Sequence, residues 1–331
     1  MGMNNWDNII GNEQVKEYLM TAIKTGILSH SYIIAGADGM GKMMLAKCFA
    51  QALLCENKTG HPCGQCHSCK QMQSGNHPDV IFVKHEKVNT IGVDDIRNGL
   101  VNDMLIKPYS SEHKIYIVDE AEKMSLQAQN ALLKTIEEPP TYGIVILLTS
   151  NIEASLPTIL SRCMVLNMKP VSDKQMDTYL KQKGLESRVI DRVLLFAQGN
   201  IGRAEKMALS EKFFSLVEQI LYILKNIADM KFEQLLDSVD QLEKYKINIT
   251  ECLDYMQLWY RDVLLFKATS DGNLIVFKDE IRYISNAAKR STYNGIESIM
   301  KAIEKAKRRL DANVNFELTM ELLLLEIKDN S

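Results

Sequence analysis

Residues 36–43 read Gly36-Ala37-Asp38-Gly39-Met40-Gly41-Lys42-Met43, which departs at one position from the phosphate-binding pattern G-x-x-x-x-G-K-[ST]. An apolar run, Tyr32-Ile33-Ile34-Ala35, precedes this glycine loop, and Met44-Leu45-Ala46-Lys47, which suits a helix, follows it. Strand, glycine-rich loop and helix in this order are typical of a phosphate-binding loop in an α/β domain. The stretch therefore predicts a parallel sheet with a nucleotide-type site at the carboxyl ends of its strands.

The glycine loop departs from the pattern at its last position. Gly36, Gly39 and Gly41 allow backbone N–H groups to turn toward phosphate oxygens at a helix N-terminus, and Lys42 adds a positive charge there. The hydroxyl that normally follows the lysine ligates Mg²⁺, whereas Met43 offers a thioether, a poor ligand for a hard cation. We therefore expect a pocket that binds ATP and Mg²⁺ weakly or not at all and hydrolyses ATP badly.

Two carboxylates follow a second apolar strand and complete the same kind of site. Lys114-Ile115-Tyr116-Ile117-Val118 leads directly into Asp119 and Glu120. Asp119 is placed to hold a metal or its water, and Glu120 to polarise a water molecule. The alternative is an acidic helix start, which the helix dipole favours. Because a glycine loop precedes them, we favour the nucleotide interpretation. Thr149, at the end of a later strand, either senses a terminal phosphate or caps a helix.

Two arginines occupy positions of interest. Arg162 ends a short helix in Leu156-Pro157-Thr158-Ile159-Leu160-Ser161-Arg162-Cys163. A lone surface arginine usually forms an ion pair. The alternative is a finger that reaches a neighbour's nucleotide and stabilises charge on the transferred phosphoryl group. The residues by themselves favour the ion pair. Arg203, in Gly199-Asn200-Ile201-Gly202-Arg203-Ala204, indicates only a helix start when it is taken alone.

Four cysteines stand at metal-binding spacing. Cys55, Cys63, Cys66 and Cys69 form the pattern C-x7-C-x2-C-x2-C, with glycines and a proline that permit tight turns between them. Four thiolates suit tetrahedral Zn²⁺, and a closed four-sulfur site leaves no open position, so we expect a structural ion. An iron–sulfur cluster and free thiols are the alternatives. A nearby histidine in place of one cysteine is a further alternative.

Size and composition indicate a soluble protein of more than one domain. The chain has 331 residues, 46% hydrophobic and 24% charged, with a formal net charge of −3. This charge provides no bulk attraction to nucleic acid, so DNA contacts require a local patch. A signal pattern and a long apolar run are both missing from the sequence, and we expect a cytoplasmic protein.

Hydrophobic periodicity divides the chain into three regions. We expect strands over residues 31–35, 79–83, 114–118, 144–148 and 163–167, alternating with helices over 12–25, 43–54, 93–104 and 126–137. Beyond Pro170 only helical spacing is found, with short helices over 173–183 and 188–198 and longer stripes thereafter. The predicted domains are an α/β domain over 1–167, a small helical domain over 168–208 and a second helical domain over 209–331.

Taken together, these motifs resemble the clamp-loader branch of the AAA+ proteins. The resemblance is carried by the glycine loop, the four cysteines, Val118-Asp119-Glu120-Ala121, residues 130–140 (Asn-Ala-Leu-Leu-Lys-Thr-Ile-Glu-Glu-Pro-Pro) and Ser161-Arg162-Cys163. It covers about the first two hundred residues with specific motifs and the remainder more loosely. It implies an AAA+ sheet domain, a helical lid and a C-terminal collar that holds a ring of subunits together.

The resemblance also implies roles for the site residues and partners for the chain. Arg162 matches the family's arginine finger and serves ATP held by an adjacent gamma/tau subunit. Thr149 and Arg203 match the two sensor positions. The implied partners are gamma/tau and delta subunits, and through the complex the sliding clamp and primed DNA. Met43 fits a subunit that does not hydrolyse ATP, while Asp119 and Glu120, a vestigial base, keep carboxylates that such a subunit no longer needs.

Two other classes of protein compete with this interpretation. One is a self-sufficient clamp-loader ATPase of the gamma/tau kind, against which Met43 argues because its loop requires Ser or Thr. The other is a zinc-bearing DNA-binding module with the α/β part as scaffold. The net charge of −3 and the absence of a dense Lys/Arg stripe near Cys55 to Cys69 argue against this second class.

Overall fold

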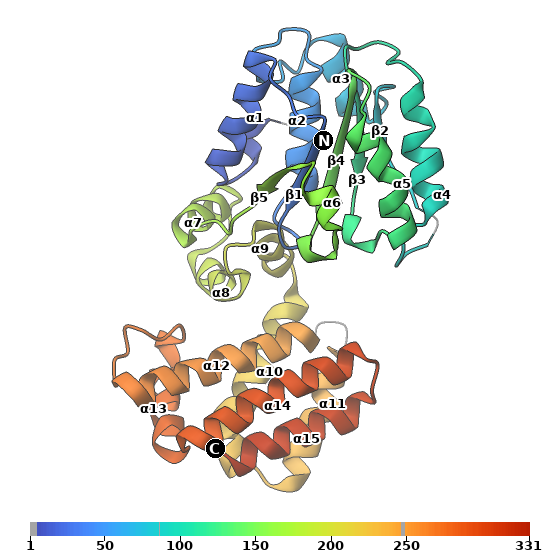
Figure 1. Cartoon of the computed structure of the whole chain (residues 1–331). Coiled ribbons are helices and arrows are strands. Elements are labelled where there is room, and N and C mark those ends of the chain that lie inside the picture. The colour runs from blue at the N-terminus through green and yellow to red at the C-terminus, as the bar shows by residue number, and fades with distance from the viewer. Residues whose placement is uncertain (1–4, 86, 246–248) are drawn as a thin grey trace. The chain divides into compact units, whose positions relative to one another are not determined.

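The chain forms two compact units, of which the first ends at Ala208 and the second begins at Leu209. The structure is a computed structural model that describes residues 5–331 apart from residue 86 and residues 246–248 (Figure 1). Each unit has its own hydrophobic core, and each is described by itself. The further division of the first unit into a sheet domain over 1–167 and a lid over 168–208 stays a prediction.

A five-stranded parallel sheet forms the centre of the first unit. Its strand order is β2-β3-β4-β1-β5, and every neighbouring pair is parallel. Central strands are buried along their whole length, as expected for a sheet covered on both faces. The parallel α/β fold predicted from the sequence is therefore confirmed. The strands are β1 Ser31–Ala35, β2 Val80–Phe82, β3 Lys114–Val118, β4 Gly143–Thr149 and β5 Met164–Asn167.

Helices cover both faces of this sheet because successive strand residues point to opposite sides. Ile115 and Ile117 pack with α1 and α2, whereas Tyr116 and Val118 pack with α4 and α5 (Figure 1). The helices are α1 Glu13–Thr25, α2 Lys42–Leu53, α3 His67–Ser74, α4 Val93–Ile96, α5 Leu126–Glu137 and α6 Pro157–Leu160. Short 3₁₀ turns are η1 Trp6–Asn8, η3 Asp103–Leu105, η4 Ala121–Lys123 and η5 Ile152–Ala154.

The helix expected over residues 93–104 is present as consecutive helical segments of different pitch. Only Val93–Ile96 is α-helical; a wide π-type turn, η2 Arg97–Val101, and then η3 follow it. Gly99 lies in the wide turn, and a Cβ built there would stand 3.2 Å from Val83 Cγ1. The glycine permits close packing of this segment on Val83 but weakens the helix, because glycine is a poor helix former. Hydrophobic spacing alone did not register this change of helical pitch.

Three short helices complete the first unit after the last strand. They are α7 Asp173–Gln182, α8 Ser187–Ala197 and α9 Ile201–Ala208. A capping box between Ser172 and Gln175 starts α7. Gln198 and Gly199, both at positive φ, separate α8 from α9. A Cβ on Gly199 would lie 2.5 Å from Pro170 Cβ, so the chain requires glycine at this turn.

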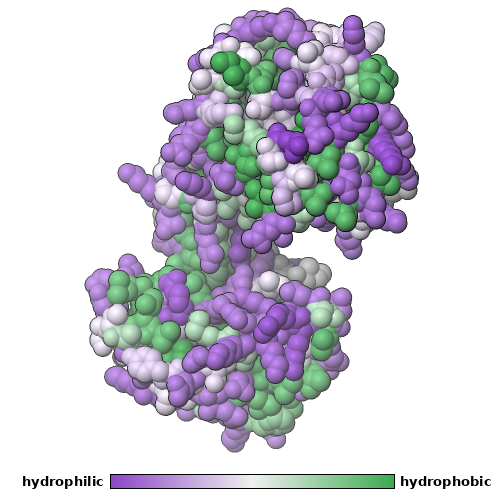
Figure 2. Space-filling view, in the orientation of Figure 1, coloured by the Kyte–Doolittle hydropathy of each residue, from purple (hydrophilic) through white to green (hydrophobic). Residues whose placement is uncertain are grey.

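All the secondary-structure elements of the second unit, within its described residues, are helices. α12 packs against α10, α13 and α14 and contributes buried Met256 and Trp259 to the core. Hydrophobic and hydrophilic residues are interspersed on the face of this unit that Figure 2 shows. Within the described residues, no helix combines the length and apolar character that a bilayer crossing requires. The elements are α10 Glu211–Asn226, η6 Ile227–Asp229, α11 Phe232–Glu243, α12 Ile249–Thr269, η8 Lys278–Glu280, α13 Ile281–Arg290, α14 Tyr293–Asp311 and α15 Phe316–Asp329.

Candidate functional site

The glycine loop lies between β1 and α2, at the carboxyl edge of the sheet. Gly39 and Gly41 have φ values of 86° and 90°, a left-handed conformation that glycine adopts without strain. Gly36 N–H donates to the Thr149 carbonyl at 3.0 Å, which joins the start of the loop to the end of β4. The sequence thus places the loop where an α/β fold binds nucleotides.

The lysine of the loop is occupied by the loop itself. Lys42 is 8% exposed, and its ammonium donates to the Gly36 carbonyl at 2.6 Å and to Asp38 Oδ1 at 3.0 Å. In a nucleotide-bound loop of this kind the lysine reaches phosphate oxygens instead. A nucleotide entering this site must therefore compete with an internal ion pair for the lysine.

The start of α9 rests directly on the glycine loop. Asn200 Nδ2 donates to the Asp38 carbonyl at 2.6 Å, and Gly202 N–H donates to the Gly39 carbonyl at 2.9 Å. A Cβ on Gly202 would stand 2.6 Å from the Gly39 oxygen, so no larger residue fits at this position without movement. We call these two hydrogen bonds the lid latch. The sequence pattern around Asn200 indicated a helix start and did not reveal this contact.

The neighbouring residue Arg203 is brought to the same place. Its backbone N–H donates to Asn200 Oδ1 at 3.0 Å, so the amide of Asn200 joins α9 to the glycine loop at both ends. The structure thus brings the second predicted sensor residue onto the helix that touches the loop. Its role in sensing a nucleotide stays a prediction.

The two carboxylates after β3 are engaged locally. Asp119 is exposed, and its Oδ1 accepts from the Glu120 N–H at 3.0 Å. Glu120 has a φ of 50°, and its carboxylate pairs with Lys123 at 2.8 Å. His85 Nε2 lies 3.9 Å from the same carboxylate. Glu120 is thus held by a cation in this structure, a poor arrangement for a base that activates water.

Thr149 and Ser150 end β4 beside these carboxylates. Thr149 is buried, and its hydroxyl donates to the Asn151 carbonyl at 3.0 Å and accepts from the Asn151 N–H at 3.1 Å. Ser150 donates through its hydroxyl to Glu122 at 2.5 Å and through its N–H at 3.2 Å. Burial raises the pKa of Glu122, but the hydrogen bonds, chiefly from Ser150, outweigh it and lower that pKa overall. Sequence reasoning missed Glu122, which fastens η4 to the end of β4.

Arg162 lies on the surface at the end of α6. Its guanidinium pairs with Glu137 at 3.0 Å and donates to the Thr158 carbonyl and the Ser161 hydroxyl, each at 3.1 Å. The Arg162 side chain is 40% exposed. Surface ion pairs contribute only about 0–1 kcal/mol, so a stronger anion can take this arginine from Glu137. The ion pair expected from the residues is present, and it leaves the guanidinium accessible.

The four cysteines converge into one cluster. The sulfurs of Cys55, Cys63, Cys66 and Cys69 all lie within 4.8 Å of one another. A tetrahedral ion with metal–sulfur bonds of about 2.3 Å requires sulfurs separated by about 3.8 Å. The Cys63–Cys69 sulfur distance is 4.0 Å, close to that requirement. The residues therefore fit a metal ion, and we call residues 55–69 the cysteine module.

Backbone N–H groups prepare these sulfurs for negative charge. The N–H groups of Cys63, Cys66 and Cys69 each point to the sulfur of the preceding cysteine at 3.4 Å. Donors from Gln65 and Cys66 lower the pKa of Cys63 to about 6, whereas burial raises the pKa of Cys69 to about 12. A cation held among the sulfurs would supply the charge that keeps all four as thiolates.

Contacts that the sequence did not indicate hold the module against the sheet domain. Trp6 Nε1 donates to the Gly60 carbonyl at 2.9 Å. Ser68 Oγ lies 3.0 Å from His77 Nε2, and His77 Nδ1 accepts from the Asp79 N–H. His77 therefore carries its proton on Nε2 and donates to Ser68. Burial lowers the pKa of His77, which agrees with a neutral ring.

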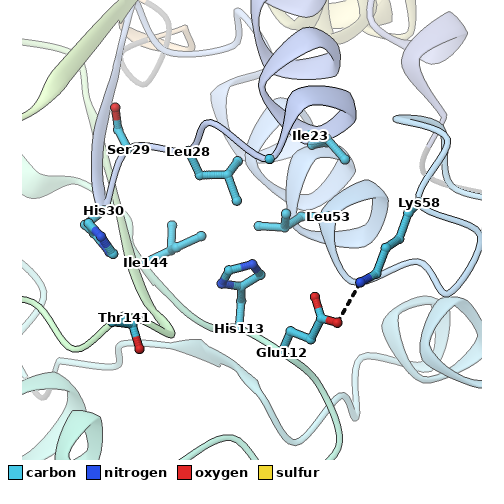
Figure 3. A pocket seen from close by; sticks show the side chains of 11 residues that line it. Ile23, Leu28, Ser29, His30, Leu53, Lys58, Glu112, His113, Thr141 and Ile144 are labelled. Carbon is cyan, nitrogen blue, oxygen red and sulfur yellow. Dashed lines mark hydrogen bonds and ion pairs between the residues drawn. The ribbon is translucent and has the colours of Figure 1, made fainter.

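A separate cavity of about 360 Å³ lies at the amino ends of the strands, where the chain enters β1, β3 and β4 (Figure 3). Ile23, Leu28, Leu53 and Ile144 provide apolar walls, and His30 and His113 stand among them. Lys58 of the cysteine module pairs with Glu112 at its rim, at 2.6 Å. Because the glycine loop lies at the carboxyl ends of the same strands, this cavity takes no part in the nucleotide-type site.

A glycine loop at the carboxyl edge of a five-stranded parallel sheet, with the start of α9 against it, defines an α/β protein with a nucleotide-type loop. The family model described as DNA polymerase III, delta subunit, matches residues 11–172, and the model for the C-terminal part of that subunit matches residues 216–329. The chain belongs to this DNA polymerase III delta-subunit family. The resemblance to clamp-loader subunits found in the sequence is thereby confirmed.

Individual relatives agree with this assignment. The chain is 28% identical to DNA polymerase III subunit delta-prime of Bacillus subtilis over 326 residues, which is 96% of each chain. It is 27% identical to subunit tau of the same organism, over 79% of this chain but only 50% of tau. Among solved structures, a gamma-subunit-related protein of Thermotoga maritima is 20% identical with a TM-score of 0.47, covering 95% of this chain and 99% of that one. The delta-prime match covers both chains almost fully and the tau match is partial, while gamma subunits of Buchnera aphidicola match at 24–25% identity over 96–97% of this chain and 93% of theirs.

Proposed function

We propose that this chain is a delta-prime-type subunit that works inside a clamp loader and does not turn over ATP by itself. The observation that carries the proposal is the state of Lys42, whose ammonium is held by Gly36 and Asp38 of its own loop. Met43 supplies no hydroxyl for Mg²⁺, and the lid latch holds α9 on the loop. These three features oppose the grip that hydrolysis requires.

ATP and Mg²⁺, where they bind at all, bind weakly at this pocket. Gly36, Gly39, Gly41 and Lys42 are the residues that would hold the phosphates, and Asp119 would hold hydrated Mg²⁺. Thr149 and Arg203 would sense the terminal phosphate. A bound metal would neutralise negative charge between the phosphates in such a site. Asp119, as a single carboxylate ligand, would bind Mg²⁺ weakly. Glu120, paired with Lys123, is a vestigial base.

Arg162 acts on a nucleotide held by another subunit. A guanidinium that is 40% exposed and bound only by a surface carboxylate and two neutral oxygens is available to a phosphate, which binds it more strongly. Stabilising the charge that develops on a transferred phosphoryl group is the work of an arginine finger. The implied neighbour is a gamma/tau subunit.

The cysteine module holds one structural Zn²⁺. Four thiolates around one point complete a tetrahedral shell and leave no position for substrate, so the ion stabilises the module without catalytic work. His61 and His67 are exposed and lie outside the four-sulfur cluster. An iron–sulfur cluster remains the alternative occupant, which metal analysis distinguishes.

The whole chain serves assembly. Residues 209–331 form the collar that joins gamma/tau and delta subunits, and through that complex the chain helps to place a sliding clamp on primed DNA in the cytoplasm. The test is to mix the purified chain with tau and delta subunits and measure the mass of the product. A stoichiometric complex is expected, and a complex of tau and delta that excludes the chain would refute the proposal. ATP turnover by the isolated chain at the rate of tau would also refute it and would favour the gamma/tau alternative.

A further inference from the structure

Gln51 carries a buried amide whose purpose the fold alone does not explain. It lies on α2 and is 0% exposed, and neither its Nε2 nor its Oε1 has a hydrogen-bond partner among the described residues. Burying an amide without a partner is unfavourable, so native proteins rarely do so without a compensating role. Its position points to that role, because α2 packs against α3, the helix that carries Cys69, and the Gln51 amide lies beside the Cys69 sulfur.

Another buried glutamine shows what a satisfied amide looks like in this chain. Gln129 on α5 is 4% exposed. Its Nε2 donates to the carbonyls of Met124 and Ala154 at 3.3 and 3.0 Å, and its Oε1 accepts from the Leu156 N–H at 2.8 Å. Gln129 therefore holds loops together by ordinary hydrogen bonds. Gln51 has no such backbone partners, and the acceptor beside it is a sulfur.

The four sulfurs differ in their donors. Those of Cys55, Cys63 and Cys66 each receive the backbone N–H of the next cysteine. Cys69 is the last of the series and has no following cysteine to supply this bond. It is 0% exposed, and the groups beside its sulfur include the Cys63 sulfur at 4.0 Å, the Gly64 N–H and the Gln51 amide. The least exposed of the four sulfurs thus lacks the cysteine N–H that the other three receive, and the Gln51 amide beside it has no partner of its own.

We propose that Gln51 is a positioning residue of the metal site, whose side-chain N–H donates to the Cys69 thiolate and fixes that sulfur for the ion. This inference rests on the proposed metal-binding function of the cysteine module. Four thiolates and one divalent cation leave a net charge of −2, and N–H donors around the sulfurs stabilise that charge in a buried site. A protonated thiol is a weak acceptor, so in the metal-free protein the amide is left unsatisfied.

This arrangement predicts opposite effects on the two states of the protein. Gln51→Met keeps the length of the side chain and removes the amide. The metal-free variant is expected to unfold at the same temperature as metal-free wild type or higher, because a buried unpaired amide is gone. Its affinity for Zn²⁺ is expected to fall about tenfold, the lower end of the effect of removing an outer-shell partner. A purely structural glutamine would destabilise both states alike.

The experiment measures Zn²⁺ affinity of the full chain by competition with a chromogenic chelator, under reducing conditions. Co²⁺ titration adds an independent readout, since loss of a hydrogen bond to one thiolate shifts the sulfur-to-cobalt charge-transfer band to lower energy. Gln129→Met is the matched control and should leave metal affinity and the band unchanged. Gln51→Glu retains the shape and places a carboxylate beside the thiolate, so it should weaken binding at least as much and serves if Gln51→Met does not fold.

The outcomes separate this inference from the metal site itself. Weaker binding by both Gln51 variants, with Gln129→Met unchanged, supports the positioning role. Equal Zn²⁺ affinity and an unshifted cobalt band in wild type and Gln51→Met would overturn it while leaving the metal site intact. Wild-type protein that takes up neither Zn²⁺ nor Co²⁺ when freshly reduced would overturn the proposed metal site and the role of Gln51 together.

Discussion

Arg162 and Lys42 are two cations that differ in how accessible they are to an incoming phosphate. Lys42 is nearly buried and donates to the Gly36 carbonyl and to Asp38, whose side chain is 88% exposed. Arg162 is 40% exposed, and its carboxylate partner, Glu137, is a surface residue that is 45% exposed. Exposed carboxylates exchange their partners readily, so the two cations differ mainly in how far each ammonium or guanidinium is open to an incoming anion. The residue that the sequence marks as a phosphate ligand is therefore the less available of the two.

Arg162→Ala is expected to reduce ATP turnover in a reconstituted loader. An arginine finger contributes about 10³–10⁵ in rate, so the one nucleotide site that Arg162 serves should become nearly silent. The folded state should be little affected, because a surface ion pair contributes about 0–1 kcal/mol. The measurements are steady-state ATPase activity of the complex and the thermal midpoint of the isolated chain.

Glu137→Gln is the matched control for this prediction, because it breaks the same ion pair but keeps the guanidinium. Turnover should not fall in that variant. Full turnover by a correctly assembled complex that contains Arg162→Ala would remove the finger assignment. An equal loss in both variants would instead indicate that the ion pair serves the fold of this surface.

At the scale of elements, the contact between α9 and the glycine loop is the feature that governs the candidate nucleotide site. The lid latch joins residues that are 162 positions apart, through Asn200 and the Asp38 carbonyl. Gly202 allows the helix backbone to approach Gly39 closely enough for a second hydrogen bond. Two backbone carbonyls of the loop, those of Asp38 and Gly39, thereby accept hydrogen bonds from Asn200 and Gly202.

Asn200→Ala is expected to loosen this contact. Loss of one hydrogen bond to a backbone carbonyl is worth about 1 kcal/mol, which corresponds to roughly fivefold faster opening of the loop. Hydrogen exchange of the backbone amides of residues 36–41, followed by mass spectrometry, measures that opening. Asn226→Ala, which removes an exposed asparagine bond within α10 of the second unit, should leave this exchange unchanged. Unaltered exchange in Asn200→Ala would show that the latch does not hold the loop.

At the scale of the whole molecule, the two units have separate cores and separate reporters. The chain has two tryptophans, and each unit contains one of them. Trp6 is 3% exposed and bonds to Gly60 of the cysteine module, whereas Trp259 is 1% exposed in the core of the second unit. A metal ion in the cysteine module can therefore stabilise the first unit directly and the second only through coupling between them.

Chelation under reducing conditions is expected to lower the unfolding temperature of the first unit. A ligand present at one hundred times its Kd contributes about 2.7 kcal/mol, which for a unit of this size is roughly 5–10 °C. Trp259→Phe leaves Trp6 as the fluorescent reporter of the first unit, and Trp6→Phe leaves Trp259 as the reporter of the second. The Trp6 transition should shift and the Trp259 transition should stay. A chelator that moves neither transition would speak against a stabilising metal.

Features of the fold and the site were predictable from the sequence when they depend on residues close together in the chain, and were missed when they depend on contacts between distant segments. All five strands were located to within one residue at either end because buried parallel strands read as apolar runs bounded by turn residues. The change of helical pitch within residues 93–104 was not predicted, because it involves the close packing of Gly99 against Val83, which lies in another segment of the chain. The metal-binding spacing of the cysteine module could be recognised in the sequence because all four cysteines lie within fifteen positions.

The sequence by itself determined the parallel α/β fold, the family, the convergence of four cysteines and the missing hydroxyl at Met43, because each of these depends on residues close together in the chain. Only the tertiary structure decided that Lys42 is occupied within its loop, that Asn200 holds the lid on that loop, that Glu137 partners Arg162 and that Gln51 lies against Cys69. These four contacts depend on which side chains meet once the helices pack, and on how much water that packing removes. The local hydrophobic periodicity of the sequence predicts neither the contacts nor the loss of water.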